Sequence, residues 1–381
     1  MRFAFSDEQE LLRRTVATFA AKELAPARLR ELDAQGLAPG PGLLPKMAAL
    51  GFTALAVPAD YGGLGGSTID MAVMFEELGR HSLAASAVLA AATGFGCEVL
   101  RRQGSEERKR DCFEQLVLGS WSCGYVAAGP GCDPDAAVAS VGALPGDGGY
   151  LVDGKQLLVS GAHDAQCLLV AARSEADRRG LSLFAIDPNA SGIDWGATRS
   201  GGLRSGGAMQ AADFNALRLA PAALLGTPGG AEPIVQAALA HARLIEAASC
   251  IGCAQQAVDA AVRYAGERRQ FGQPIGKFQA ISHLLVDLQV EVDAARTLVY
   301  RAAWRADASN EAIHETALAH LAASEALLST TSQAMRVYGG YGLTLEFDIG
   351  RHFRDARCFV VGDGAARSQR DLVARSMGLT T

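Results

Sequence analysis

Residues 267–279 carry the most informative motif of the chain, Glu267-Arg268-Arg269-Gln270-Phe271-Gly272-Gln273-Pro274-Ile275-Gly276-Lys277-Phe278-Gln279. A second motif of the same kind is Gln333-Ala334-Met335-Arg336-Val337-Tyr338-Gly339-Gly340-Tyr341-Gly342. In both, a helix is expected to stop at glycine beside an arginine. Arginine offers forked donors that suit a phosphate, and paired glycines let another group approach the backbone. Taken alone, each motif is better explained as a helix C-cap with a solvated charge.

Helical periodicity surrounds these motifs, over residues 231–268, 278–307, 310–338 and from 365 onward. It also fills the first part of the chain from Ser6, which offers an N-cap, to about residue 117. Between residues 121 and 225 the segments are short, alternating and separated by Gly or Pro, which is typical of strands.

This order predicts an α+β protein with three domains. Residues 1–118 form an N-terminal α-helical domain, residues 119–225 a middle β-barrel or β-sandwich domain, and residues 226–381 a C-terminal four-helix bundle.

Composition excludes several classes of protein. The 381 residues, 49% hydrophobic and 20% charged, are typical of a globular chain with two or three cores. The net charge of -6 without a long basic run argues against a nucleic-acid partner. We also expect no membrane segment, because the best apolar stretch, residues 83–97, is Ala-rich and is followed by Glu98. Without a secretory signal pattern at Met1, the expected location is the cytoplasm.

The eight cysteines are scattered, and Cys250 and Cys253 are the only close pair. Both fall in an Ala-rich helical segment without a second pair at zinc-site spacing. We therefore expect no metal site, and we interpret these cysteines as small core residues.

Several further motifs add to the two arginine-glycine stretches. They are Val57-Pro58-Ala59-Asp60-Tyr61-Gly62-Gly63-Leu64-Gly65, Glu76-Glu77-Leu78-Gly79-Arg80, Gly131-Cys132-Asp133, Asp153-Gly154-Lys155, Arg354-Asp355-Ala356-Arg357 and Gly362-Asp363-Gly364. Together they resemble the acyl-CoA dehydrogenases, flavoenzymes that place a double bond between the α and β carbons of a thioester. The resemblance extends over nearly the whole chain and implies the fold of that family.

The resemblance also implies a cofactor, FAD, that is shared between subunits. In the family, flavin lies between the β domain and the C-terminal helices of one subunit, while a neighbour holds the pyrophosphate and adenine. The residues of this chain that would reach toward a neighbour's FAD are Arg268, Gln270, Phe271, Arg336, Gly339 and Gly340. Implied partners are an acyl-CoA substrate and an electron-transfer flavoprotein or other acceptor.

The catalytic base implied by the resemblance is Asp363, in Asp363-Gly364-Ala365, where the family usually has Glu-Gly-Thr. Asp is one methylene shorter, and a base displaced by about an ångström loses on the order of a hundredfold in rate. The family's other location for the base is Ala242 here, ahead of Arg243. Asp363 is thus the single candidate for this role.

The flavin contacts implied by the resemblance are altered. A Thr-Glu-Pro run is replaced by Val126-Ala127-Ala128, a Trp-Ile-Thr run by Leu157-Leu158-Val159, and a Thr by Ala365, while Pro130 removes an N–H donor. Four lost hydrogen bonds at about 1 to 1.5 kcal/mol each would weaken binding by about three to four powers of ten. We therefore expect this chain to hold flavin poorly in its own β domain.

An intact clamp beside an altered flavin pocket predicts a partner subunit of an α2β2 heterotetramer that completes the FAD site of a catalytic subunit. Heterotetrameric members of the family resemble this, and several act on bulky lipid substrates such as steroid side chains. Two alternatives stay open. One is a self-sufficient homotetrameric acyl-CoA dehydrogenase with Asp363 as base. The other is a flavin oxidase similar to nitroalkane oxidase, which uses an Asp base. A non-redox acyl-CoA-binding module is a further class.

Overall fold

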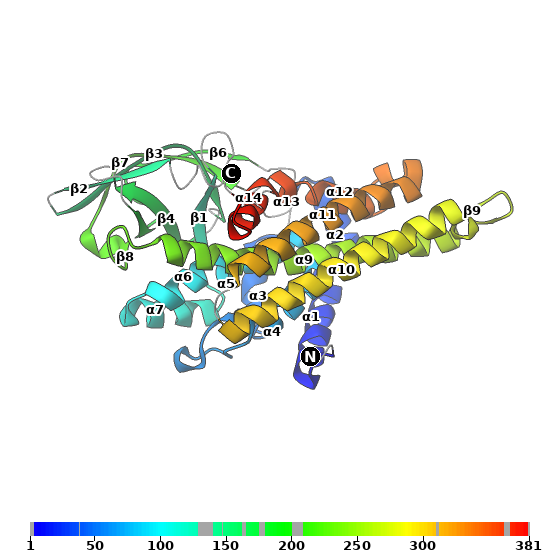
Figure 1. The fold of residues 1–381 in the computed structure, drawn as a ribbon, viewed down its shortest axis with the longest axis horizontal. Helices are drawn as coiled ribbons and strands as arrows, with labels where there is room; N and C mark the ends of the chain where they lie inside the picture. Colours follow the sequence, from blue (N-terminus) through cyan, green and yellow to red (C-terminus); the bar gives the residue numbers. More distant parts are fainter. Residues whose placement is uncertain are drawn as a thin grey trace.

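The computed structural model describes residues 4–37, 39–128, 140–146, 148–161, 165–174, 180–199, 209–309, 312–361 and 366–379. Helices come first along the chain, then an eight-stranded sheet, then long helices again (Figure 1). The predicted α+β class and its order of helical, β and helical parts are confirmed.

The N-terminal part is a set of helices that begin at serine caps. Ser6 accepts a hydrogen bond from the backbone N–H of Gln9, whose side chain accepts one from Ser6 in return, so the expected cap is present. Ser67 and Asp70 repeat this arrangement. The helices are α1 (Asp7–Glu23), α2 (Pro26–Ala34), α3 (Leu44–Ala48), α4 (Thr68–His81), α5 (Leu83–Thr93), α6 (Phe95–Gln103) and α7 (Glu106–Val117).

The middle part is a mixed sheet in the order β6-β7-β3-β1-β4-β5-β8, in which β2 pairs with both β3 and β4. Its strands are β1 (Cys123–Ala128), β2 (Val141–Gly146), β3 (Gly149–Ser160), β4 (Cys167–Ser174), β5 (Leu181–Ile186), β6 (Ile193–Arg199), β7 (Met209–Leu219) and β8 (Leu224–Leu225). Buried residues on one face form a core of their own, while β1 packs on α6 through the stacked rings of Tyr125 and Phe95.

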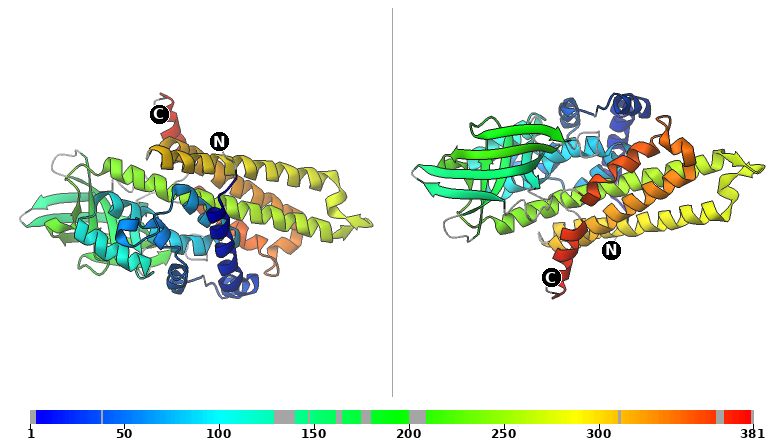
Figure 2. Two further views of the ribbon diagram at one scale, coloured as in Figure 1. Left: turned by 90° about the horizontal axis from the view of Figure 1, so that it is seen from below. Right: turned by 90° about the horizontal axis from the view of Figure 1, so that it is seen from above.

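The C-terminal part consists of long helices that extend away from the sheet (Figures 1 and 2). A two-stranded hairpin, β9 (Arg269–Gln270) and β10 (Gln273–Pro274), joins the first two of them. The helices are α9 (Glu232–Glu267), α10 (Gln279–Ser309), α11 (Ile313–Tyr338), α12 (Ile349–Asp355), α13 (Cys358–Val361) and α14 (Ala366–Ser376).

Two glycines let α4 and α9 cross in direct backbone contact. A Cβ atom on Gly252 of α9 would lie 1.9 Å from the carbonyl oxygen of Glu76, and one on Gly79 of α4 would lie 2.3 Å from that of Ser249. Neither position can accept a side chain without separating the helices. The motif Glu76–Arg80 therefore holds the N-terminal helices against α9.

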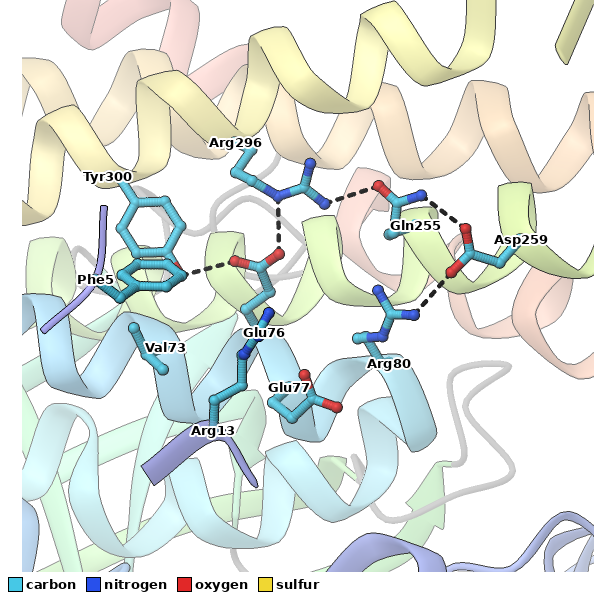
Figure 3. A pocket seen from close by; sticks show the side chains of 10 residues that line it. All are labelled: Phe5, Arg13, Val73, Glu76, Glu77, Arg80, Gln255, Asp259, Arg296 and Tyr300. Carbon is cyan, nitrogen blue, oxygen red and sulfur yellow. Dashed lines mark hydrogen bonds and ion pairs between the residues drawn. The ribbon is translucent and has the colours of Figure 1, made fainter. Parts of the chain in front are cut away.

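Charged side chains line a cavity of about 370 Å³ next to the crossing of α4 and α9 (Figure 3). Glu76 of α4 accepts a hydrogen bond from Nε of Arg296 at 2.8 Å and one from the Tyr300 hydroxyl at 2.7 Å. Arg296 and Tyr300 both belong to α10. One carboxylate therefore joins α4 to α10.

The same network continues along α9 (Figure 3). Gln255 accepts a hydrogen bond from Arg296 at 2.9 Å and donates one to Asp259 at 2.9 Å. Asp259 in turn pairs with Arg80 of α4 at 2.7 Å. Because these contacts join α9 to both α4 and α10, they fix the orientation of its C-terminal end.

Two segments, Leu83–Gln103 and Glu232–Glu267, are long and apolar enough to cross a membrane by length and composition alone. The first is interrupted at Gly94, between α5 and α6. In both, most of the apolar window is buried inside the protein. They are therefore accounted for as core helices.

Candidate functional site: a groove at the ends of α9 and α11

A groove of about 490 Å³ lies where α9 and α11 end. Figures 1 and 2 show β9, which borders it, at the end of the molecule opposite the eight-stranded sheet. The groove is lined by Tyr264, Arg268, Gln270, Ile275, Val337, Tyr338, Gly339, Gly340, Tyr341 and Thr344. It therefore joins the two motifs that the sequence places far apart.

The hairpin after α9 has a strained turn. Arg268 caps α9 with its backbone N–H on the carbonyl of Tyr264, and the chain turns between Gln270 and Gln273. The two central residues both have positive φ, 51° at Phe271 and 81° at Gly272, as a type I′ turn requires. A phenylalanine rarely adopts this conformation. Its ring is 92% exposed at the tip of the hairpin.

The other wall of the groove forms where α11 stops. Gly339 follows Tyr338 with φ 59° and ψ -139°, a conformation that is essentially restricted to glycine. The chain then continues into the 3-10 turn η6 (Gly339–Leu343). A Cβ atom on Gly339 or Gly340 would meet nothing within 4 Å, so the backbone there faces open space.

Aromatic rings support the arginine in the groove. Tyr264 and Tyr338 stack with centroids 4.2 Å apart, and the Tyr338 hydroxyl donates to the carbonyl of Ala260. Burial raises the pKa of Tyr338 to about 12, so its hydroxyl stays protonated. The Arg268 guanidinium carbon lies 5.3 Å from the centroid of Tyr341, within cation–π range. The positive charge is thereby held over a rigid surface.

The structure brings together four of the predicted clamp residues, Arg268, Gln270, Gly339 and Gly340. Phe271 lies next to them but points outward, with its ring near that of Phe278. Arg336 is exposed and donates a hydrogen bond to Gln333 of its own helix.

These residues fit the pyrophosphate half of FAD. A guanidinium suits a phosphate, and a backbone without side chains over open space admits a dinucleotide close to the chain. Arg268 would hold the pyrophosphate, while Gly339 and Gly340 would let it approach.

Two of the residues that the resemblance matches to flavin contacts in the β domain, Val126 and Val159, are described and lie opposite each other on β1 and β3. Val159 is 1% exposed and belongs to the core of the sheet, against which Val126, its partner in register, also packs. Successive side chains of a strand alternate between faces, so Val126 and Val159 share one face, and the expected loss of flavin-facing hydroxyls at these positions stays a prediction. Leu158 and Ser160 lie on the opposite face, and Ser160 is paired with Tyr125, which packs toward the helices.

Ser160 is a further candidate, which the sequence analysis did not consider. It is the hydroxyl-bearing residue directly after Val159, on the face of the sheet next to α6. The signal was present in the burial periodicity of β3, because the apolar residues Leu157 and Val159 occupy one face and leave Ser160 on the other.

Several expected positions lie outside the described residues: Pro130, Gly131, Cys132, Asp133, Asp363 and Ala365. The second base position of the resemblance, Ala242, is described and buried in α9, so it supplies no carboxylate. Its neighbour His241 faces the carbonyl of Thr93 at 3.3 Å. Burial lowers the pKa of His241, so its imidazole is neutral at pH 7.

Among the described residues, no cluster of three or more His, Cys, Asp or Glu side chains is arranged to hold a metal ion. Within the same ranges, Cys250 and Cys253 are both fully buried in α9.

The fold, together with comparison with known proteins, defines a flavoprotein oxidoreductase and gives its family. The N-terminal domain of acyl-CoA dehydrogenases matches residues 6–120, and the C-terminal domain matches residues 230–378. The chain is 32% identical over 381 residues to the probable acyl-CoA dehydrogenase YngJ of Bacillus subtilis, covering 99% of this chain and 100% of that protein. It belongs to the acyl-CoA dehydrogenase family, and FAD is its cofactor.

Two further relatives bear on electron transfer and cofactor binding. The chain is 29% identical to CarC, a subunit of the caffeyl-CoA reductase-Etf complex of Acetobacterium woodii, covering 97% of this chain and 98% of that one. The solved structure of PigA with FAD and proline superposes with a TM-score of 0.92 and 26% identity, covering 100% of both chains.

Proposed function

We propose that this chain is an acyl-CoA dehydrogenase subunit that completes the FAD site of a second, catalytic subunit in an α2β2 heterotetramer. The supporting observation is the position of the groove. Arg268 and Gly339 line the groove beside β9, and β9 lies at the end of the molecule opposite the sheet (Figures 1 and 2). A clamp at that end serves a neighbouring subunit rather than the β domain of its own chain.

The proposed reaction is the α,β-dehydrogenation of an acyl-CoA thioester. A carboxylate takes the α proton as the β carbon gives up a hydride, which FAD accepts when bound. In the heterotetramer the catalytic subunit would supply that base. In a self-sufficient enzyme Asp363 of this chain is proposed for the role, and its shorter side chain would have to lie closer to the substrate than Glu. Lipid or steroid acyl-CoA thioesters are the proposed substrates.

A self-sufficient homotetramer is the second candidate, and Ser160 is the observation that favours it. A hydroxyl on the helix-facing side of β3 would offer flavin a donor in place of the one expected to be lost at Val159. In this arrangement the clamp would serve a second copy of the same chain.

The proposed electron acceptor is an electron-transfer flavoprotein, by analogy with the Etf complex that contains CarC. We propose that the reaction takes place in the cytoplasm.

The decisive experiment is the visible spectrum of the chain purified alone and with a second acyl-CoA dehydrogenase-like subunit. The proposal predicts a colourless protein alone and a yellow complex, bleached by acyl-CoA without oxygen. A yellow homomer bleached by acyl-CoA would support the second candidate. A yellow homomer that turns over a nitroalkane would contradict both and support an oxidase.

A further inference from the structure

Two cysteines lie side by side in the sheet, away from the clamp groove. Cys123 at the start of β1 is directly opposite Cys167 at the start of β4 in a parallel pair. Opposed residues on adjacent strands project to the same face, and both side chains contact the helical core. Adjacent strands are about 4.8 Å apart, within the Cα separation of roughly 4.4 to 6.8 Å that a disulfide spans.

The environments of the two thiols differ. Cys123 is 2% exposed beneath α6, where a Cβ atom on Gly96 would lie 2.8 Å from its sulfur. Cys167 is only partly buried, so of the two cysteines it is the one more open to solvent.

The more exposed thiol, Cys167, also has the lower pKa. Burial raises the pKa of the Cys123 thiol well above its usual range. A hydrogen bond from Cys123, together with the charge of Arg108, lowers the pKa of the Cys167 thiol. Reactive redox cysteines are accessible, readily form the thiolate and lie next to a second cysteine that can resolve the oxidised form.

We propose that Cys167 and Cys123 form a peroxide-reactive dithiol, in which Cys167 is oxidised first and Cys123 then closes a disulfide between β1 and β4. The Cys167 thiolate attacks one oxygen of hydrogen peroxide, the O–O bond breaks, and the hydroxide that leaves takes a proton to become water. The sulfenic acid formed on Cys167 is attacked by the sulfur of Cys123, which gives up its proton. The S–S bond forms, the S–O bond breaks, and a second water leaves, so two thiols lose two electrons to the peroxide.

A third cysteine offers a matched control. Cys112 on α7 is also partly exposed, and burial together with the charge of Cys167 raises the pKa of its thiol. Cys112 is not in register with Cys167, whereas Cys123 is. The proposal therefore names Cys123 as the resolving residue.

The test is peptide mapping of the full chain after brief exposure to hydrogen peroxide, followed by alkylation with iodoacetamide under denaturing conditions. We expect two fewer alkylated cysteines, a linked peptide pair containing Cys123 and Cys167, and full reversal by dithiothreitol. Unchanged alkylation of both residues, or a link between Cys112 and Cys167, would overturn the proposal.

Variants separate the two roles. Cys112→Ser should retain the linked peptides, and Cys167→Ser should leave Cys123 reduced. Cys123→Ser should leave a sulfenic acid on Cys167 that the probe dimedone traps. A dimedone adduct that forms on Cys112 instead would count against the order of events. Because the mapping of the unmodified chain stands by itself, a variant that fails to fold does not weaken the test.

Discussion

The guanidinium of Arg268 lies over the ring of Tyr341, with 5.3 Å between the guanidinium carbon and the ring centroid. Arg268 follows the last residue of α9, whereas Tyr341 belongs to η6, which follows α11. Such a contact contributes about 0.5 to 1 kcal/mol at a partly exposed site. It fixes the end of one helix against the end of another, and so forms the groove that the two glycines leave open.

Substitutions of Gly339 and Gly340 should distinguish the effect of backbone strain on stability from the effect of groove contact on FAD binding. Gly339→Ala places a side chain in a conformation essentially restricted to glycine, so we expect a loss of about 1 to 3 kcal/mol in the free energy of unfolding. Gly340→Ala has neither positive φ nor a close neighbour, and stability should change by less than about 0.5 kcal/mol. Its methyl group would nevertheless enter the groove, so the FAD content of the complex with the second subunit should fall.

Urea unfolding and FAD content by absorbance measure the two effects. Equal stability losses in both variants would contradict the assignment of strain to Gly339 alone.

Phe271 should show a conflict between stability and function. Phe271→Asn gives the turn the Asn-Gly pair that type I′ geometry favours, and the free energy of unfolding should rise by about 1 kcal/mol. The FAD content of the complex with the second subunit should fall at the same time, because the exposed ring beside the groove is lost. Thermal unfolding and absorbance test this pair of outcomes, and unchanged FAD content would show that the ring has no part in binding.

Ser160 and Val159 distinguish the two faces of β3. If the β domain holds any flavin, Ser160→Ala should raise the dissociation constant of FAD about tenfold, and Ser160→Thr should restore it. Val159→Thr should leave FAD binding unchanged and lower stability, because its hydroxyl would enter the core of the sheet. FAD titration followed by fluorescence measures the dissociation constant of each variant. Tighter binding by Val159→Thr would show that Val159, and not Ser160, lies on the flavin-facing side of β3.

Glu98 on α6 should make stability depend on acid pH. Burial by itself raises the pKa of Glu98, but hydrogen bonds from Arg101 and Arg102 and the nearby His241 hold that pKa below its usual value of 4.5. The carboxylate therefore stabilises the fold fully above about pH 4.5, and this stabilisation is lost as the pH falls through the lowered pKa.

Glu98→Gln should remove this pH dependence and lower the free energy of unfolding by about 2 kcal/mol at pH 7. The loss is smaller than for a fully buried ion pair, because both arginines are partly exposed. Glu114→Gln on exposed α7 is the control. The free energy of unfolding of each variant is measured at several pH values. An equal loss of stability at acid pH in Glu98→Gln and in the unmodified chain would contradict the role of Glu98.

Much of the fold could be predicted because its signals are local. The Ser6 cap, the long helical periods and the short alternating strands each report on a few neighbouring residues. The joining of Arg268 to Gly339 was predicted through family resemblance, since no local pattern relates the two helix ends. The stacking on Tyr341 depends on how those ends pack, and could not be predicted from spacing.

The faces of β3 show what the sequence motif left open. The resemblance matches Val159 to a flavin contact, but a shift of one residue in a strand exchanges its two faces. The burial of Leu157 and Val159 fixes the face and brings Ser160 into consideration.

The central claim is that this chain lends its clamp to a neighbour's FAD. The most direct measurement is the FAD content of the chain co-purified with a second acyl-CoA dehydrogenase-like subunit, comparing Arg268→Ala with Arg269→Ala. Arg269 donates to the carbonyl of Gly272 within the hairpin and serves as the matched control. Loss of a charge-assisted hydrogen bond worth about 1.5 to 3 kcal/mol should weaken FAD binding by about 10- to 100-fold in Arg268→Ala alone. Equal FAD content in the two variants would contradict the account.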